Sequence, residues 1–420
     1  MDVVQARVLP SIRRPRRQFT SAQTWMGLGY AVFVLAAIYT LYVESYHFDL
    51  ALFRGMFVPD SVNMAATFDD QATLTGGIPF EESLKGPSLL FGWLWVVDPS
   101  LCIWLNGAMM LVAGLVICRV VDILEAPRWA VLGLFLNPYL TLVAVGPNKE
   151  IPLILLTATW LLLLITQRKG WQVGALLLAF LAYLIRDGYG VSLAIIALFL
   201  ALTRARARSL PLFYFLLCVG IAGLFGVLVS IIPILSRNYS GFQEGFDTGT
   251  AVGNLAATFA FDPLSFVGGI VLFLLRIIYN TLTLAIFPIL KTEYGYNFWL
   301  GIAYCAFGIA NLATVLASLY HIIKAPAGKR RERDLAAALT LATLCSISVS
   351  QFVQPRYMMP VMPFGFIVLA TLPITIRWYL TLLTGALVAG VIGLYALSGQ
   401  APLPAEITLH DPPVFLWTAI

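Results

Sequence analysis

The chain has 420 residues, of which 60% are hydrophobic and only 11% are charged, and its mean hydropathy is +0.87. A soluble domain carries about 25% charged residues, so this composition excludes an ordinary soluble protein. The net charge of +5 does not indicate nucleic-acid binding, because the basic residues fall in short clusters between apolar runs.

The N-terminal segment, residues 1–24, is basic and leads into an apolar run from Trp25 to about Val43. A cluster of arginines precedes this run and no small-residue cleavage site follows it, so we expect an uncleaved span with a cytoplasmic N-terminus. A transmembrane helix needs about 20 apolar residues, and runs of that length recur as far as Leu397. The sequence therefore predicts an all-α, polytopic integral membrane helical bundle of about 10–12 transmembrane helices.

The predicted transmembrane domain covers residues 25–398, and residues 399–420 are expected to form an external tail. Polar loops at about residues 44–86 and 236–296 are expected outside, and a third span is expected near Trp129 to Val145. Basic residues mark cytoplasmic turns, and this scheme places most Lys and Arg residues in the cytoplasm and most Asp and Glu residues outside.

One apolar segment, Val267 to Leu290, does not fit this alternation. It is long enough to cross once, but a single crossing would place the basic residues 329–333 outside. We therefore expect either two short half-spans or a helix along the outer face. Arg276 and Asn280 near its middle indicate a non-lipid environment, because arginine at the bilayer centre costs at least about 2.5–3.5 kcal/mol.

Charged residues gather on the predicted external face. Lys149 and Glu150 interrupt two apolar runs, Arg186 and Asp187 occupy the equivalent place at the next external turn, and a later span begins after Arg356 and Tyr357. Each has a simpler explanation: a helix cap or snorkelling for Lys149–Glu150, a local ion pair for Arg186–Asp187, or lipid binding by Arg356. Three cations on separate turns, facing carboxylate-rich loops, instead predict an anion site beside candidate bases.

Five stretches carry a family resemblance through their order along the chain. They are "VPDSVNMAATF", "GPSLLFGWLWVVDPSLCIWLNGAMM", "NPYLTLVAVGPNKEIPLILL", "LLLAFLAYLIRDGYGVSLAIIALFLAL" and "QPRYMMPVMPFGFIVLA". In this order they resemble the GT-C superfamily of integral membrane glycosyltransferases, which use polyprenyl-phosphate-linked sugars. The triplet Asn148-Lys149-Glu150 is more similar to polymerase-like proteins of cell-envelope polysaccharide synthesis.

The resemblance implies an inverting glycosyltransferase with a GT-C-like bundle and external loop helices. It would move a sugar from a polyprenyl-(pyro)phosphate donor to a glycan, lipid or protein acceptor, at the periplasmic face of a bacterial inner membrane. Asp60, or secondarily Asp49, would be the catalytic base. The donor phosphate would be bound by Lys149, Arg186 and Arg356, and the supporting residues would be Glu150, Asp187, Tyr357, Asp69 and Asp70.

The first-loop motif departs from the family pattern in one respect. The family often has paired acids there, whereas Asp60 is followed by Ser61 and the pair Asp69–Asp70 lies further along. A divalent cation, Mg²⁺ or Mn²⁺, would suit this acidic loop, but no ligand spacing in the sequence requires one.

Two other functions also account for an apolar chain with external charges. A transporter or flippase of a lipid-linked glycan or an anion would need charges near the bilayer midplane and halves related by internal repeats. No such repeat is evident, and Arg276 is the candidate midplane charge. A scaffold for envelope assembly would leave the external charge cluster without a purpose.

Overall fold

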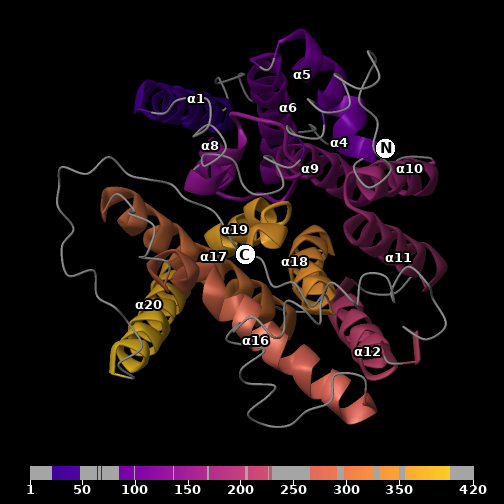
Figure 1. Cartoon of the computed structure of the whole chain (residues 1–420). Helices are drawn as coiled ribbons and strands as arrows, with labels where there is room; N and C mark the ends of the chain where they lie inside the picture. Colours follow the sequence, from indigo (N-terminus) through magenta and orange to yellow (C-terminus); the bar gives the residue numbers. More distant parts are fainter. Residues whose placement is uncertain are drawn as a thin grey trace, which may run out of the picture.

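Helices make up all the regular structure that a computed structural model of the chain describes, and the all-α prediction is confirmed for this part of the protein (Figure 1). Long runs rich in Leu and Ala favour helices. The described residues are 21–47, 64, 68, 85–98, 100–135, 137–167, 170–203, 207–225, 227–228, 265–290, 298–324, 331–349 and 355–397.

The N-terminal half contains a series of helices joined by tight turns. Gln167 after α9 and Gly170 before α10 adopt left-handed backbone conformations, with φ of 44° and 79°, which fold the chain back on itself. The elements are α1 (Ser21–His47), α4 (Lys85–Pro87), the π-helical turn η2 (Ser88–Gly92), α5 (Trp93–Val97), α6 (Leu101–Ile123), η3 (Arg128–Val131), α7 (Leu132–Phe135), α8 (Pro138–Val143), α9 (Glu150–Thr166), α10 (Trp171–Ile185) and α11 (Asp187–Thr203).

The C-terminal half contains the longer helices. Prolines in the first turns of α12 and α19 suit positions where the backbone N–H has no partner within the helix. The elements are η4 (Ala207–Ser209), α12 (Leu210–Gly223), α16 (Phe266–Leu290), α17 (Phe298–Lys324), α18 (Arg331–Val349), η6 (Pro355–Met358), α19 (Met362–Thr371) and α20 (Ile374–Leu397).

Helices α18 and α19 lie near the middle of the bundle (Figure 1). Helix α18 packs against α9, α11, α12, α16, α17 and α19, and most of its residues are buried. The N-terminal helices α1 and α6 pack on each other, and α9 lies against both α6 and α10. The central position of α18 lets it connect the two halves of the chain.

The bundle has two ends, which we name after residues found there. The Glu150 end contains the start of α9, the α10–α11 junction and η6, which are joined by contacts of Arg186. The Arg333 end contains the end of α6, η4 and the start of α18, which are joined by hydrogen bonds of Arg208 and Arg333. Helix α9 spans the distance between them, since Gln167 at its far end accepts a hydrogen bond from Arg331.

Two glycines allow close packing at the α10–α11 junction. A Cβ added to Gly190 would lie 2.2 Å from the backbone nitrogen of Tyr183, and one added to Gly86 would lie 2.5 Å from the carbonyl oxygen of Leu184. Any larger residue would push α11 or α4 away from α10. These contacts fix the position of Arg186, which lies in the chain between α10 and α11.

The predicted third span, Trp129 to Val145, is wrong as a continuous helix. This segment forms η3, α7 and α8, with a break around Asn137. Pro138 explains the break, because proline has no N–H to donate and disfavours helical geometry in the residue before it.

The segment that did not fit the alternating topology forms one unbroken helix, α16, of 25 residues. The alternative of two short half-spans is therefore wrong. Arg276 and Asn280 on this helix are 5% and 1% exposed and lie against the end of α18. Their predicted non-lipid environment is confirmed.

When only the residues whose side chains are also described are counted, α6 is the one helix whose length and apolar composition both suit a membrane crossing.

Candidate functional site

An ion pair at the Glu150 end connects two of the residues that the sequence analysis selected. Arg186 Nη2 lies 3.2 Å from Glu150 Oε1, and the two side chains are 15% and 4% exposed. Glu150 is the first residue of α9, where the helix dipole favours a negative charge. Arg186 ends α10 in an extended conformation, which directs its side chain across to α9.

Tyr357 forms the other side of Arg186. The centre of the guanidinium group lies 4.2 Å from the centre of the Tyr357 ring, within the range of a cation–π interaction. Tyr357 belongs to η6, just before α19. Three predicted residues from separate parts of the chain, Glu150, Arg186 and Tyr357, therefore meet at one place.

Arg186 retains hydrogen-bonding capacity in this arrangement. Its Nη1 is buried and has no hydrogen-bond partner among the described residues. An unpaired donor on a charged group costs more than the roughly 1–3 kcal/mol of a neutral one. The arginine is thus held by Glu150 and Tyr357, with a further donor that an anion would satisfy.

The turn that carries Lys149 is held by two buried asparagines, which the sequence analysis missed. Asn106 on α6 donates from Nδ2 to the carbonyl oxygens of Ala144 and Gly146, at 2.9 and 2.8 Å. Asn148 donates to Asn106 Oδ1 at 3.0 Å, and its own Oδ1 accepts the Ile151 N–H at 2.9 Å. This network caps α9 and anchors its start to α6. The available signal was an amide residue inside the apolar run "LCIWLNGAMM".

Lys149 lies immediately before α9 and is half-buried. Its backbone N–H donates to Glu150 Oε2 at 3.2 Å. Glu150 thus binds both the turn and Arg186. Arg186 therefore pairs with an acid on another helix, and the alternative of a local Arg186–Asp187 ion pair concerns a side chain outside the described residues.

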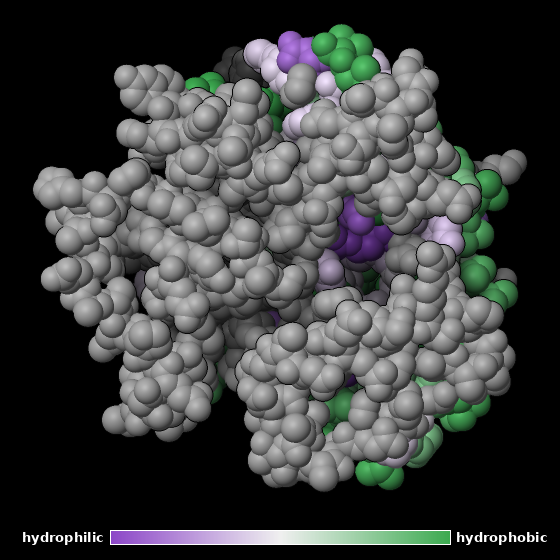
Figure 2. All heavy atoms as spheres, viewed as in Figure 1, coloured by the Kyte–Doolittle hydropathy of each residue, from purple (hydrophilic) through white to green (hydrophobic). Residues whose placement is uncertain are grey.

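A series of polar side chains continues from this cluster into the bundle. Thr157 Oγ1 and Tyr189 Oη are 3.0 Å apart, Ser192 and Ser346 hydroxyls are 2.5 Å apart, and Asn280 donates to Ser348 at 3.0 Å. Arg276 donates to the Val349 carbonyl at 3.4 Å. Figure 2 shows hydrophilic atoms in the middle of this face, where α9, α11 and α18 approach one another in Figure 1.

Several predicted site residues lie outside the described part of the chain. These are the acids Asp49, Asp60, Asp69 and Asp70, together with the side chains of Asp187 and Arg356. Near Asp60 in the sequence, Met64 and Phe68 are helical and fully buried in the main core. The backbone of Arg356 lies in η6, directly before Tyr357.

Asp98 is a carboxylate at the same end that is described. It is exposed and accepts the backbone N–H of Ser100 at 2.8 Å. Hydrogen bonds from Ser100 lower the pKa of Asp98, which favours the ionised form. Its geometry is that of a turn before α6. Among the described residues, no three His, Cys, Asp or Glu side chains are grouped to hold a metal ion.

No known protein family, curated protein or solved structure matches the chain.

Proposed function

We propose that this protein is a polytopic membrane glycosyltransferase of GT-C-like architecture. It transfers a sugar or oligosaccharide from a polyprenyl-(pyro)phosphate donor to a glycan, lipid or protein acceptor in cell-envelope synthesis. The observation that carries the proposal is the Arg186 guanidinium, which is held by Glu150 and Tyr357 and whose buried Nη1 has no hydrogen-bond partner among the described residues.

The surface of the bundle supports a membrane location. Large apolar side chains point outward from several helices, and Leu202, Trp104 and Leu382 are 80%, 75% and 68% exposed. Figure 2 shows hydrophobic residues along the outer margin beside α10 and α11. The polar side chains described above lie inside. This arrangement, with apolar side chains outside and polar side chains inside, is the reverse of the arrangement in a soluble protein. It suits contact with lipid.

Helix length gives further support. Helices α1 and α17 have 27 residues each, and α20 has 24. At 1.5 Å per residue, each exceeds the roughly 30 Å of a hydrocarbon core. In the proposed orientation, the N-terminus and the Arg333 end face the cytoplasm and the Glu150 end faces the periplasm.

The Glu150 end supplies what the leaving group of this reaction requires. The acceptor hydroxyl oxygen attacks the anomeric carbon, the bond from that carbon to the phosphate oxygen breaks, and the phosphate leaves with the electron pair. Arg186, Lys149 and Arg356 would stabilise the negative charge on the phosphate. A first-loop carboxylate, Asp60 or secondarily Asp49, would take the proton of the hydroxyl. A single displacement inverts the anomeric configuration.

The buried amide network would keep this site in place during the reaction. Asn106 and Asn148 hold the Lys149 turn through bonds whose donors and acceptors are paired. A rigid set of donors needs little reorganisation when charge develops on the phosphate.

Binding of a phosphate-bearing lipid by variants of Arg186 tests the proposal. The purified protein in lipid nanodiscs is titrated with a fluorescent polyprenyl monophosphate and with the corresponding polyprenol. We expect tight binding of the phosphate only, and a loss of at least tenfold in Arg186→Gln, since a charged hydrogen bond contributes about 1.5–3 kcal/mol.

The matched control is Arg119→Gln, because Arg119 is an exposed arginine near the far end of α6. It should bind the phosphate as the unchanged protein does. Equal binding of polyprenol and polyprenyl phosphate, or unchanged affinity in Arg186→Gln, would contradict the proposal.

Transport is the second candidate function, and Arg276 favours it. This arginine is 5% exposed in α16, and its Nε has no hydrogen-bond partner among the described residues. A buried arginine within a membrane bundle is a common feature of substrate pathways. The test measures the flux of a lipid-linked glycan across the membrane of proteoliposomes. Flux that is lost in Arg276→Gln, in the absence of glycosyl transfer to any acceptor, would support this alternative.

A further inference from the structure

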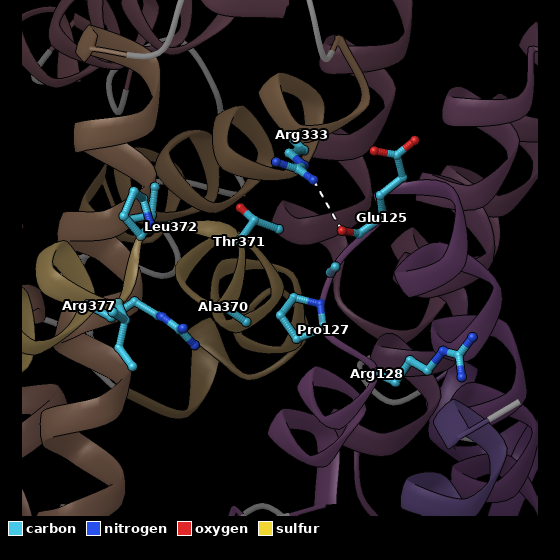
Figure 3. Close-up of a pocket in the computed structure, with 11 residues that line it drawn as sticks. Glu125, Pro127, Arg128, Arg333, Ala370, Thr371, Leu372 and Arg377 are labelled. Carbon is cyan, nitrogen blue, oxygen red and sulfur yellow. Dashed lines mark hydrogen bonds between the residues drawn. The ribbon is translucent and has the colours of Figure 1, made fainter.

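An open cleft lies at the Arg333 end, remote from the site described above (Figure 3). It has a volume of about 660 Å³ and is lined by the turn after α6, the start of α18 and the α19–α20 turn. Its charged lining residues are Arg128, Arg333, Arg377 and Glu125. Figure 3 shows the Glu125 carboxylate directed away from the centre of the cleft. The interior is therefore positively charged.

Arg333 forms a fixed wall of this cleft. It is 8% exposed, and it donates from Nε to the Leu124 carbonyl at 2.9 Å and from Nη2 to the Glu125 carbonyl at 3.3 Å. Helix α6 ends here with Glu125 at φ of 50° and with the Ala126 N–H bonded to the Val121 carbonyl, which is a Schellman motif. Arg333 binds the carbonyls that this motif leaves over, so its charge cannot move away.

Arg377 is the less satisfied arginine of the cleft. It extends from α20 towards Ala370 and Pro127 in Figure 3, and its guanidinium centre lies 5.7 Å from the centre of the Trp129 ring. Its Nε is buried and has no hydrogen-bond partner among the described residues. Arg128 lies on the opposite rim and points away from Arg377 in Figure 3. Arg377 is thus positioned to bind an anion in the cleft.

The rim of the cleft has the composition of a membrane interface. Leu372 and Ile374 line it, and Ile374 is 61% exposed. Trp378 and Tyr379, the next residues of α20 after Arg377, are 62% and 65% exposed. Exposed Trp and Tyr residues at a helix end are typical of the head-group level of a bilayer. An anion in this cleft would therefore lie beside lipid acyl chains.

We propose that this cleft binds the phosphate group of an anionic membrane lipid, such as phosphatidylglycerol. Arg377 and Arg333 bind the phosphate, and Ile374 and Leu372 contact the start of the acyl chains. Basic pockets between membrane helices bind anionic head groups in this way. The inference rests on the membrane location in the proposed function, but it does not depend on glycosyl transfer.

Native mass spectrometry of the full chain in detergent tests the inference. Dioleoyl phosphatidylglycerol is added in one series and dioleoyl phosphatidylcholine in another. We expect a retained adduct with phosphatidylglycerol and at least fivefold less with phosphatidylcholine. Arg377→Gln should reduce the phosphatidylglycerol adduct at least fivefold, whereas Arg119→Gln should not change it. An undiminished adduct in Arg377→Gln would overturn the proposal.

A second arm separates a lipid from free phosphate. Inorganic phosphate at millimolar concentration should not displace the lipid adduct. If it binds alone with the same dependence on Arg377 and the lipid does not bind, the cleft takes a soluble phosphate and the lipid proposal is wrong.

A second pair of variants covers the case in which Arg377→Gln does not fold. Ile374→Glu places a carboxylate at an exposed position on the rim and should repel the lipid phosphate. Ile374→Gln changes the same side chain without adding charge. A reduced adduct in Ile374→Glu only supports the proposal, and equal adducts in the two variants contradict it. Polyprenyl phosphate binding at the other end should be unchanged in Ile374→Glu, so failure of this inference is distinct from failure of the proposed function.

Discussion

The two ends of the bundle both bring arginines to helix ends, but they differ in how the charges are satisfied. At the Arg333 end, Arg208 and His321 bind the two oxygens of Asp334 at 3.1 and 3.0 Å, and Arg333 binds two backbone carbonyls. At the Glu150 end, Arg186 and the backbone N–H of Lys149 both bind the Glu150 carboxylate, and Arg186 Nη1 has no partner within the part of the chain that the structure describes.

Under the proposed function, this difference corresponds to a structural role for the Arg333 end and a ligand-binding role for the Glu150 end. The charges inside the Arg333 end join α6, α17, α18 and η4, and their bonds hold these helices together. The Glu150 end holds its arginine in place but leaves it with a donor unused, as a ligand site requires. Arg377 is the exception at the Arg333 end, and it lies at the cleft rather than inside the bundle. The comparison predicts that changes at the Glu150 end affect activity and that changes inside the Arg333 end affect stability.

The largest expected effect is the loss of activity in Asp60→Asn. Removing the proposed base should lower the rate of glycosyl transfer on the order of 10²–10⁴-fold. Transfer is measured with a lipid-linked sugar in proteoliposomes, and polyprenyl phosphate binding and the Tm should stay unchanged. Full activity in Asp60→Asn would remove this residue as the base and direct attention to Asp49→Asn.

Arg333→Ala should show the second largest effect, on stability rather than on binding of polyprenyl phosphate at the Glu150 end. Two carbonyls at the end of α6 would lose a buried, charged partner, which costs about 2–3 kcal/mol. Thermal unfolding in detergent should show a lower Tm, with polyprenyl phosphate affinity unchanged in the folded fraction. The control is Arg331→Ala, because Arg331 is exposed and bonds at the surface to Gln167 at 3.2 Å. Equal losses in the two variants would contradict the assignment.

The smallest effect concerns the pH dependence of stability at Asp334. Burial alone would raise the pKa of Asp334, but hydrogen bonds from His321 and Arg208, and their charges, lower it below its usual value near 4. A lowered pKa in the folded state stabilises the protein above the unfolded pKa, and this contribution is lost as the pH falls through the folded pKa.

The matched variant for this effect is Asp334→Asn, which keeps the shape but cannot ionise. At pH 7 its Tm should lie below that of the unchanged protein, and the gap should narrow as the pH falls below about 4. A gap that stays constant from pH 7 to pH 3 would show that the charge of Asp334 does not contribute.

The candidate site was partly predictable from the sequence. The alternation of basic and acidic segments placed Glu150, Arg186 and Tyr357 on one face, and the structure brings these three together. The pairing of Arg186 with Glu150 was not predictable. The two residues are 36 positions apart, and only the packing of α9 against α10 brings them together.

One wrong prediction and one open alternative were decided by local physical causes. Hydropathy predicted one span near Trp129 to Val145, but Pro138 breaks this segment and three short helical pieces form instead. The parity of basic segments left α16 open between two half-spans and a helix along the outer face. No proline interrupts this segment before Pro288, near its end, which explains why it forms one unbroken helix.

The sequence by itself determined that the described part of the chain is helical, that its helices are apolar, and that most of its charges lie near helix ends, with Arg276 as an exception. These properties follow from composition and from the spacing of residues along the chain. Only the tertiary structure decided that Asn106 holds the Lys149 turn, that Arg186 lies between Glu150 and Tyr357, and that Arg377 and Arg333 share a cleft. The physical reason is that hydrogen bonds and ion pairs act over about 3 Å, whereas these residues are far apart in the chain and are brought that close only by helix packing.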